Sequence, residues 1–156
     1  MADKDIPGVI APPPLIFLSF LLFGIAADWL LKLALVAGDQ LPRWVTGGTL
    51  LGLGILIMVL GVTSFARAGT PVPTREPTRA LATGGVHGIS RNPLYISLFL
   101  MYSGLAVLAN SVAAIALLIP LALVIRYGVV AREERYLERK FGEDYLAYKR
   151  RVPRWI

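Results

Sequence analysis

Four apolar stretches dominate the chain, and each is long enough to cross a lipid bilayer as a helix. They cover residues 14–36, 44–66, 92–108 and 111–127. An α-helix rises about 1.5 Å per residue, so roughly 20 residues cross a hydrocarbon layer ~30 Å thick. The sequence therefore predicts an all-α, polytopic membrane protein with about four transmembrane helices.

Composition narrows the possible functions. The chain has 156 residues, is 56% hydrophobic and carries a formal net charge of +6. We expect a single integral membrane domain over residues 1–156, because the length suits one compact unit and the hydrophobic fraction exceeds that of ordinary soluble domains. Positive charge beside so much apolar surface favours anionic lipid over nucleic acid. The lack of cysteine excludes disulfides and thiolate nucleophiles, and the single histidine excludes a His-pair metal site, so we expect no metal.

The charges of the connecting segments predict the orientation. Residues 67–91 contain four arginines and one glutamate, and the chain from Arg126 onward contains nine basic and five acidic residues. The positive-inside rule therefore places this loop and the C-terminal segment 128–156 in the cytoplasm. An even number of spans places the amino terminus there too. It lacks the basic start of a signal peptide, so we expect the first span to be retained.

Polar, glycine and proline residues inside the spans predict local helix features. Asp28 and Lys32 are four residues apart, so they share a helix face; we expect an ion pair near the membrane boundary, with a polar contact to the bundle interior as the alternative. The glycines of the second span include a Gly48-x-x-x-Gly52 pair that allows close helix approach, and we expect all of them to serve helix packing: Gly47, Gly48, Gly52, Gly54 and Gly61. Pro120 should kink its span or end a regular stretch of it.

The last two spans and the tail have a recognisable pattern. Only residues 109–110 separate those spans, which predicts an antiparallel helical hairpin. The tail carries an apolar stripe at helical spacing, with Gly142 expected to break the helix. Its members are Val130, Leu137, Phe141, Tyr145 and Tyr148. This pattern is typical of a basic amphipathic segment on the bilayer surface.

A polar loop leads directly into the third span. A loop as long as residues 67–91, in so small a protein, is typical of a functional or a disordered segment. Pro93 suits the first turn of a helix, where no amide donor is needed, and Asn92 can cap that helix through its side-chain oxygen. This places Arg91 at the start of a membrane helix. Polar groups at that position cost free energy, so they are usually functional or paired.

The loop and the tail are expected on the same side of the membrane, where they bring charged and polar residues together. These residues are Arg79, His87, Arg91, Tyr95, Arg126, Glu133 and Glu134. Arg126 and Glu133 are seven apart and so lie on nearly the same helix face. Both signs of charge in a partly desolvated cleft suit a zwitterionic ligand with an organic tail. The alternatives are a solvated face for the two glutamates, a local hydrogen bond for His87 and a loop-bracing role for Arg91.

Two motifs carry a family resemblance. The first is Gly85-x5-Arg91-Asn-Pro-x-Tyr95. The second is Arg132-Glu-Glu-x-x-Leu-x-x-x-Phe-Gly-x-x-Tyr-x-x-Tyr-x-x-x-Val-Pro153. Together with the hairpin between them, they resemble the isoprenylcysteine carboxyl methyltransferase and phospholipid methyltransferase superfamily. The resemblance covers about residues 70–153, and the two motifs together are specific.

The resemblance implies an integral membrane methyltransferase that uses S-adenosylmethionine without a soluble Rossmann-type fold. The cofactor would lie between the ends of the last membrane helices, the preceding loop and the C-terminal helix. The implied cofactor-binding residues are Arg79, Ala80, Leu81, Ala82, His87, Asn92, Pro93, Leu94, Tyr95 and Glu133. The implied substrate-binding or catalytic residues are Arg91, Arg126, Arg132 and Glu134. Asn92 replaces a common histidine and His87 replaces a common tyrosine, which leaves the individual contacts open.

The predicted reaction is methyl transfer from S-adenosylmethionine to a lipophilic acceptor reached from the bilayer. Isoprenylcysteine-type carboxyl methylation is the first choice and phospholipid amine N-methylation the second. A carboxylate acceptor is already ionised, whereas an amine or thiol needs a proton acceptor such as Glu133, Glu134 or His87. The rival interpretations are a sterol-type reductase that uses NADPH and a non-catalytic membrane scaffold. The expected partners are a lipophilic small molecule or prenylated substrate and membrane lipids, not nucleic acid; the acceptor and the oligomeric state stay open.

Overall fold

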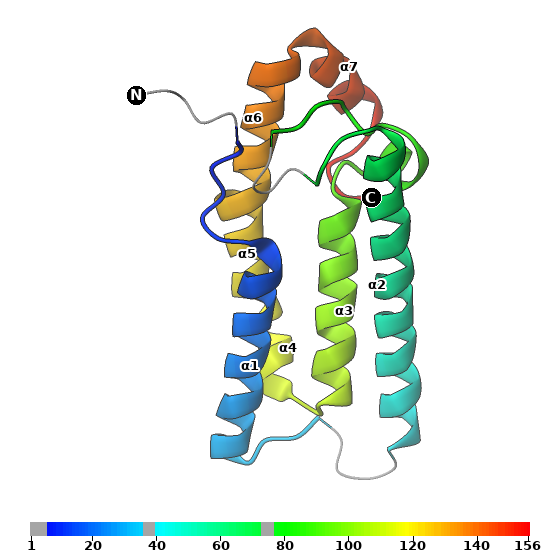
Figure 1. The fold of residues 1–156 in the computed structure, drawn as a ribbon. Coiled ribbons are helices and arrows are strands. Elements are labelled where there is room, and N and C mark those ends of the chain that lie inside the picture. Colours follow the sequence, from blue (N-terminus) through cyan, green and yellow to red (C-terminus); the bar gives the residue numbers. More distant parts are fainter. Residues whose placement is uncertain (1–5, 36–39, 73–76) are drawn as a thin grey trace.

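The computed structural model describes residues 6–35, 40–72 and 77–156, and this part of the chain is helical with no strands (Figure 1). In chain order, the elements are α1 (Pro13–Leu31), α2 (Leu41–Arg67), the 3-10 helix η1 (Gly85–Gly88), α3 (Pro93–Leu108), α4 (Val112–Ala116), α5 (Leu118–Ile125), the π-helix η2 (Arg126–Val130), α6 (Ala131–Phe141) and α7 (Glu143–Arg151).

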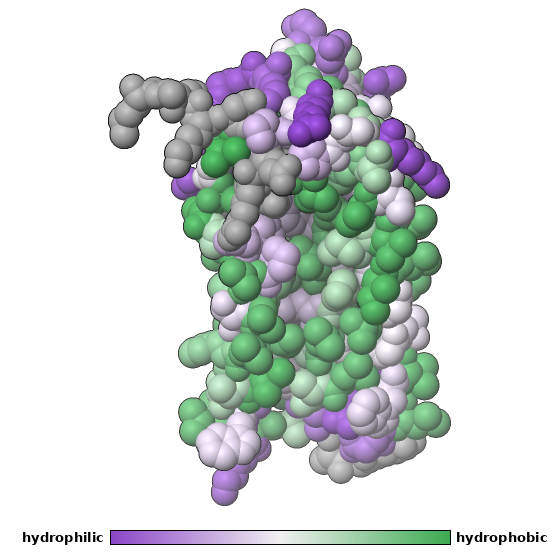
Figure 2. Space-filling view, viewed as in Figure 1, coloured by the Kyte–Doolittle hydropathy of each residue, from purple (hydrophilic) through white to green (hydrophobic). Residues whose placement is uncertain are grey.

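Three helical stretches are long and apolar enough to cross a membrane. They are Pro13–Leu31, Leu41–Arg67 and Val112–Phe141, and the apolar α3 runs beside them with 16 residues. Hydrophobic residues cover most of the visible flank, and hydrophilic ones gather toward its ends (Figure 2). The predicted class, an all-helical integral membrane protein, is confirmed. The first span ends earlier than expected because Lys32 takes a left-handed conformation with φ of 54°; residue 36 lies outside the described residues.

Glycines bring α2 and α3 together, but not those of the predicted pair. Gly47, Gly54 and Gly61 are buried, and a Cβ built on each would lie 2.5–2.7 Å from a side-chain atom of α3. A Cβ on Gly48 or Gly52 meets nothing within 4 Å. The predicted use of glycines in packing is therefore confirmed for Gly47, Gly54 and Gly61 and is wrong for the Gly48–Gly52 pair. Glycines seven residues apart recur every two turns, and this repeat forms the helix face toward α3.

The chain returns after α3 in the opposite direction, as the hairpin prediction requires (Figure 1). The hairpin arms diverge, so that α3 packs mainly against α2 while α4 packs against α1. The returning helix is interrupted at Leu117, between α4 and α5. Pro120 explains the break, because it has no N–H to donate to the carbonyl of Ala116. The predicted effect of Pro120 is confirmed.

Asp28 lies buried at the end of the bundle where α4 begins. Its carboxylate accepts hydrogen bonds from the Ser111 hydroxyl and, at 3.1 Å, from the backbone N–H of Ala113. Lys32 is exposed and forms the C-cap of α1. The expected ion pair with Lys32 is therefore wrong, and the alternative contact to the bundle interior is the one present. A carboxylate at the start of α4 is stabilised by the unpaired N–H groups there.

The opposite end of the bundle gathers the described parts of the loop, 67–72 and 77–91, with α6, α7 and the carboxy terminus (Figure 1). α6 continues the line of α5 through η2, so it does not lie flat on a bilayer surface as expected. Gly142, with φ of 49°, ends α6 as predicted, and α7 folds back over the loop. Tyr145, Tyr148 and Val152 then pack with the side chains of Leu81, Leu137 and Phe141. The apolar stripe therefore covers the loop.

Candidate functional site

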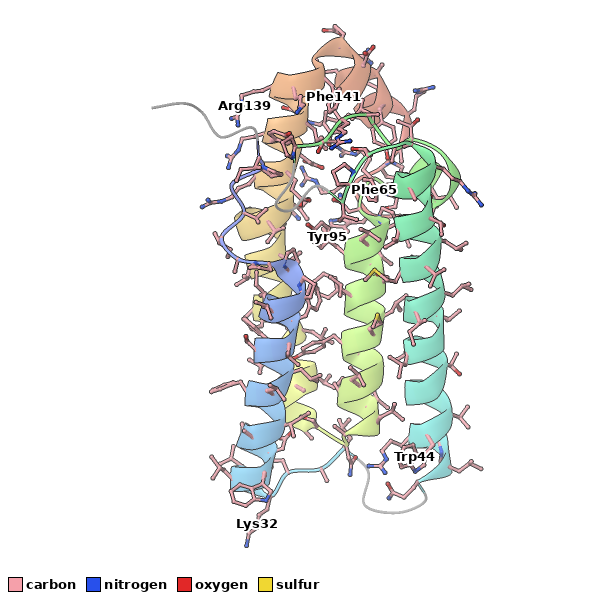
Figure 3. All side chains as sticks on the ribbon, in the orientation of Figure 1. Lys32, Trp44, Phe65, Tyr95, Arg139 and Phe141 are labelled. Carbon is pink, nitrogen blue, oxygen red and sulfur yellow. The ribbon has the colours of Figure 1, made fainter. Side chains whose placement is uncertain are left out.

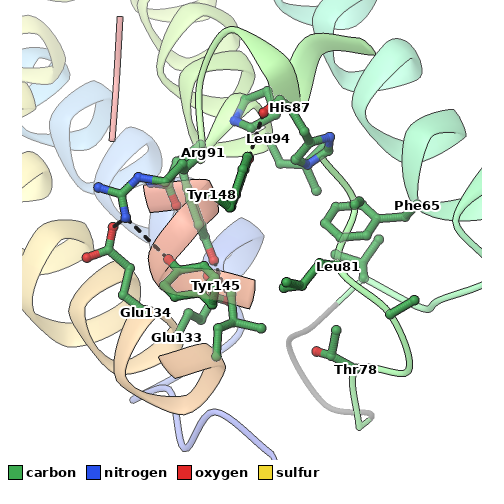
Figure 4. Close-up of a pocket in the computed structure, with 17 residues that line it drawn as sticks. Phe65, Thr78, Leu81, His87, Arg91, Leu94, Glu133, Glu134, Tyr145 and Tyr148 are labelled. Carbon is green, nitrogen blue, oxygen red and sulfur yellow. Dashed lines mark hydrogen bonds and ion pairs between the residues drawn. The ribbon is translucent and has the colours of Figure 1, made fainter. Parts of the chain in front are cut away.

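A cavity lies where the loop, the first turn of α3, α6 and α7 meet (Figure 4). Its empty volume is about 660 Å³, including the part that is open to solvent. It is lined by Phe65, Val72, Thr78, Ala80, Leu81, Ala82, His87, Arg91, Asn92, Pro93, Leu94, Tyr95, Glu133, Glu134, Leu137, Tyr145 and Tyr148. Figure 3 shows Tyr95 and Phe65 near this end of the bundle, far from Trp44.

Glu134 is held between two arginines from distant parts of the sequence. Arg91 Nη1 lies 3.0 Å from its Oε1 and also donates to the Tyr145 hydroxyl at 3.3 Å (Figure 4). Arg154 donates through Nε at 3.0 Å and through Nη2 at 2.6 Å. These hydrogen bonds to the Glu134 carboxylate raise the pKa of Arg154 above its usual value. A carboxylate with only 7% of its side chain exposed requires such compensation.

The neighbouring Glu133 has a different partner. The hydroxyl of Tyr95 donates a 2.8 Å hydrogen bond to Glu133 Oε1, and both residues are buried. Tyr95 comes from the first turn of α3 and Glu133 from the first turn of α6. This bond therefore ties the two helices together at the cavity wall.

The carboxy-terminal segment fixes the Arg-Asn-Pro motif through the main chain. The N–H of Arg91 donates to Pro153 O at 2.9 Å, and Ser90 Oγ and Asn92 Nδ2 donate to Arg154 O at 3.2 and 2.9 Å. Pro93 is in the first helical turn, as predicted. Asn92 occupies the N-cap position, but its side chain makes no capping hydrogen bond. The capping prediction is wrong because the side-chain amide binds the C-terminal segment instead.

His87 lies in η1, buried against α2 and α7. Its ring packs edge-on against Phe65 with centroids 4.7 Å apart, and its carbonyl accepts a 2.6 Å hydrogen bond from the Tyr148 hydroxyl. Burial lowers the pKa of His87 to about 4. The imidazole is therefore neutral at pH 7 and is a weak proton acceptor.

Three buried polar atoms at the cavity have no hydrogen-bond partner within the described part of the chain. They are Thr78 Oγ1, His87 Nδ1 and Arg91 Nε. Buried polar groups are almost always paired, and leaving one unpaired costs about 1–3 kcal/mol. These atoms offer donors and an acceptor to a ligand, while Phe65, Leu81, Leu94 and Leu137 give the cavity an apolar wall.

Most of the predicted site residues line this one cavity. They are Ala80, Leu81, Ala82, His87, Arg91, Asn92, Pro93, Leu94, Tyr95, Glu133 and Glu134. Arg79 does not: its side chain is exposed, although its backbone N–H donates to Thr70 Oγ1 at 2.8 Å and so shapes the loop. The roles assigned to these residues stay predictions.

Arg126 and Arg132 lie outside the cavity. Arg126 is exposed, with its guanidinium 5.5 Å from the Tyr127 ring centroid, and Arg132 is exposed and donates to Gly8 O at 3.0 Å. The expected common face of Arg126 and Glu133 is wrong. The π-turn at Arg126–Val130 contains more residues per turn than an α-helix, and it rotates Arg126 away from the face that carries Glu133.

Several cavity residues were not identified from the sequence. Tyr145, Tyr148 and Leu137 were placed on the apolar stripe without a role in a site, whereas Phe65, Val72 and Thr78 carried no signal. Arg154 directly follows the Val-Pro that closes the second motif, and this position was the only available indication.

The fold and the cavity together define a small polytopic helical membrane protein with a cavity at one end that is lined by apolar side chains and by buried polar and charged groups. The sequence pattern of the phospholipid methyltransferase family matches residues 42–144, two thirds of the chain. The chain therefore belongs to the phospholipid methyltransferase family and is a membrane methyltransferase. This confirms the family resemblance, since the match includes the Arg-Asn-Pro motif and the glutamate pair.

Three relatives extend the comparison. Protein-S-isoprenylcysteine O-methyltransferase B of Arabidopsis thaliana is 29% identical over 133 residues, which are 81% of this chain and 66% of that protein. The nickel-cobalt-cadmium resistance protein NccN of Alcaligenes xylosoxydans is 28% identical over 154 residues, 94% of this chain and 70% of NccN. An uncharacterized protein of Haemophilus influenzae is 44% identical over its full length of 64 residues, 40% of this chain. No solved structure gives a significant match.

Proposed function

We propose that this protein transfers a methyl group from S-adenosylmethionine to a lipophilic acceptor that reaches the cavity from the bilayer, and that the acceptor group is a carboxylate of the isoprenylcysteine type. The observation that carries the proposal is the cavity itself. It joins two buried glutamates, an arginine whose side chain is 7% exposed, and three polar atoms without a partner among the described residues, at the end of an apolar helical bundle.

The residues of the cavity suit this cofactor. S-adenosylmethionine supplies an electrophilic methyl group on a sulfonium. Glu133 and Glu134 would hold its ammonium or ribose hydroxyls through charge-assisted hydrogen bonds, and Arg91 would bind its carboxylate. Thr78 Oγ1 and His87 Nδ1 would pair with polar atoms of the adenosine, while Leu81 and Leu137 would pack against its apolar parts.

The protein's own part in the reaction is placement. An in-line displacement is accelerated when the nucleophile is held ~3–3.5 Å from the carbon it attacks. Arg91 is fixed by Glu134 and Tyr145, so it can orient an acceptor without free rotation. α7 and the loop cover the cavity and limit the access of water.

The occupation of the possible bases favours a carboxylate acceptor. Glu133 accepts from Tyr95, Glu134 is bound by two arginines, and His87 is a weak base with a pKa of about 4. Glu134 and His87 are thus poor proton acceptors, and Glu133, through its second carboxylate oxygen, is the one group of the three left as a base for an amine. A carboxylate needs no base, because it is ionised at neutral pH. The similarity to the Arabidopsis isoprenylcysteine methyltransferase supports the same choice.

Ligand binding tests the proposal directly. S-adenosylmethionine, S-adenosylhomocysteine and NADPH are titrated into the detergent-purified protein by calorimetry. We expect micromolar binding of both sulfur ligands and a loss of ~10-fold or more in Glu133→Gln, about 1.4 kcal/mol. Binding of NADPH alone would instead indicate a reductase, and binding of none by a folded protein would indicate a scaffold.

The acceptor is tested separately with the labelled methyl donor. An S-prenylated cysteine with a free carboxylate should become labelled, and its methyl ester should not. If a phospholipid amine is labelled and the prenylated cysteine is not, the proposed carboxyl methylation is wrong and the reaction is N-methylation.

A further inference from the structure

Three arginines share one exposed face of α6. Arg132, Arg135 and Arg139 are exposed and follow one another at intervals of three and four residues, so they share one side of the helix. The two acidic residues in the first turn of α6, Glu133 and Glu134, are buried toward the cavity. Glu138, the third acid of α6, is half-buried and pairs with Lys149 of α7. One helix thus presents two acids toward the cavity and three arginines outward.

These arginines surround a hollow. Together with Pro7 and Gly8 they line an open space with an empty volume of about 380 Å³. Arg132 is anchored there by its 3.0 Å hydrogen bond to Gly8 O. Among the described residues, no carboxylate forms an ion pair with any of the three. Three like charges around one hollow repel one another, and an anion between them would relieve that repulsion.

The hollow borders the apolar flank of the bundle. The segment that lines it continues to Ile10, whose N–H donates to Gly128 O at 3.3 Å and whose side chain is 52% exposed. In the helical segments that precede α6, Leu123 of α5 and Tyr127 of η2 are also exposed. Arg139 lies at the far end of α6, away from this flank (Figure 3). Hydrophobic residues cover the flank, and hydrophilic residues gather toward this end of the molecule (Figure 2).

We propose that this hollow binds the phosphate of an anionic phospholipid, with the acyl chains of the lipid lying along the exposed flank of α1 and α5. Guanidinium groups match phosphate in charge and in bidentate geometry. A choline headgroup would bring a cation toward the arginines, so the net negative lipid is the favoured ligand. The site is separate from the methyl-transfer cavity, and the proposal does not depend on the acceptor.

The test uses short-chain lipids and the full chain in a non-ionic detergent. Dioctanoyl phosphatidylglycerol, dioctanoyl phosphatidylcholine and inorganic phosphate are titrated by calorimetry. The double variant R135Q/R139Q removes two charges from the hollow. The matched control R150Q/R151Q removes two charges from exposed positions on α7. If R135Q/R139Q does not fold, as judged by circular dichroism, the single variant R139Q replaces it, with R150Q as its control.

We expect phosphatidylglycerol to bind at least 10-fold more tightly than phosphatidylcholine or inorganic phosphate. R135Q/R139Q should weaken it by roughly 10-fold or more, since each arginine near an anionic lipid contributes about 1 kcal/mol. The control should change the affinity less than 2-fold. Equal losses in both double variants, equal affinity for the two lipids, affinity for inorganic phosphate equal to that for phosphatidylglycerol, or no binding of phosphatidylglycerol would each overturn the proposal.

Discussion

The guanidinium of Arg154 lies 2.6 Å from Oε2 of Glu134, and this contact joins the C-terminal segment to α6 across the cavity. The same segment accepts hydrogen bonds from Ser90, Arg91 and Asn92 through its main-chain carbonyls. The two sequence motifs, around Arg91 and around Glu134, are therefore tied together by one short stretch that contains Arg154.

Replacing Arg154 by glutamine should loosen both the site and the fold. Hydrogen bonds to charged groups contribute about 1.5–3 kcal/mol, but Arg154 is 31% exposed and Arg91 still balances Glu134, so we expect a loss near 1 kcal/mol. The melting temperature in detergent should fall, and S-adenosylmethionine should bind several-fold more weakly. Arg150→Gln is the control, since Arg150 is exposed. An unchanged affinity would show that Arg154 contributes to stability alone.

The bond between Tyr95 and Glu133 should be visible in a double-mutant cycle. Tyr95→Phe removes the donor and keeps the ring, and Glu133→Gln keeps the shape and removes the charge. Each change should weaken S-adenosylmethionine binding, with a coupling of about 0.5–3 kcal/mol between them, because the residues are in contact. Calorimetry on the four proteins measures this coupling. Additive effects within error would mean that the bond does not shape the binding site.

His87 should make the stability depend on acid pH. Its pKa is about 4 in the folded protein against 6.5 for a solvent-exposed histidine in the unfolded chain, because burial disfavours the charged ring. As pH falls from about 6.5 to 4, the unfolded chain takes up a proton that the folded chain does not, so stability decreases over that interval. Melting temperatures between pH 8 and pH 4 measure the slope, and His87→Gln should reduce it. The same slope in both proteins would contradict a depressed pKa.

The α2–α3 contact gives a matched pair of glycine variants in one helix. A Cβ on Gly54 would lie 2.6 Å from Met101 Cγ and 2.9 Å from Ser97 O, whereas a Cβ on Gly52 meets nothing within 4 Å. Gly54→Ala should cost about 1–3 kcal/mol through overpacking. Gly52→Ala should be neutral or slightly stabilising because alanine is the better helix former. Thermal unfolding in detergent compares the two variants. Similar melting temperatures would contradict the assignment of Gly54, and not Gly52, to the face of α2 that packs on α3.

The sequence predicted those features that depend on local composition and spacing. The apolar runs indicated the spans, Pro120 and Gly142 marked real interruptions, and the two motifs indicated the loop and helices that form the cavity. The orientation in the membrane and the roles of the cavity residues stay predictions.

The features that escaped prediction depend on tertiary partners. Asp28 and Lys32 are neighbours on a helix face, but Ser111 and Ala113, more than 80 residues away, bind the aspartate. Nothing local distinguishes Gly48 from Gly47, because only the position of α3 decides which of them must be small. No local pattern in the sequence distinguishes Arg154, and its partner Glu134 lies 20 residues away and is brought close by the fold.

The π-turn at Arg126–Val130 sets the rotational phase of everything that follows it. Successive residues of an α-helix are about 100° apart around the axis, and a π-turn holds one residue more than an α-turn, so this turn takes up one extra residue without rotating α6. Converting the turn to a regular α-helix with all five residues kept would rotate α6 by up to about that angle and turn Glu133 and Glu134 away from the cavity wall. Deleting one residue within the turn would instead restore a regular helix and leave the two glutamates facing the cavity.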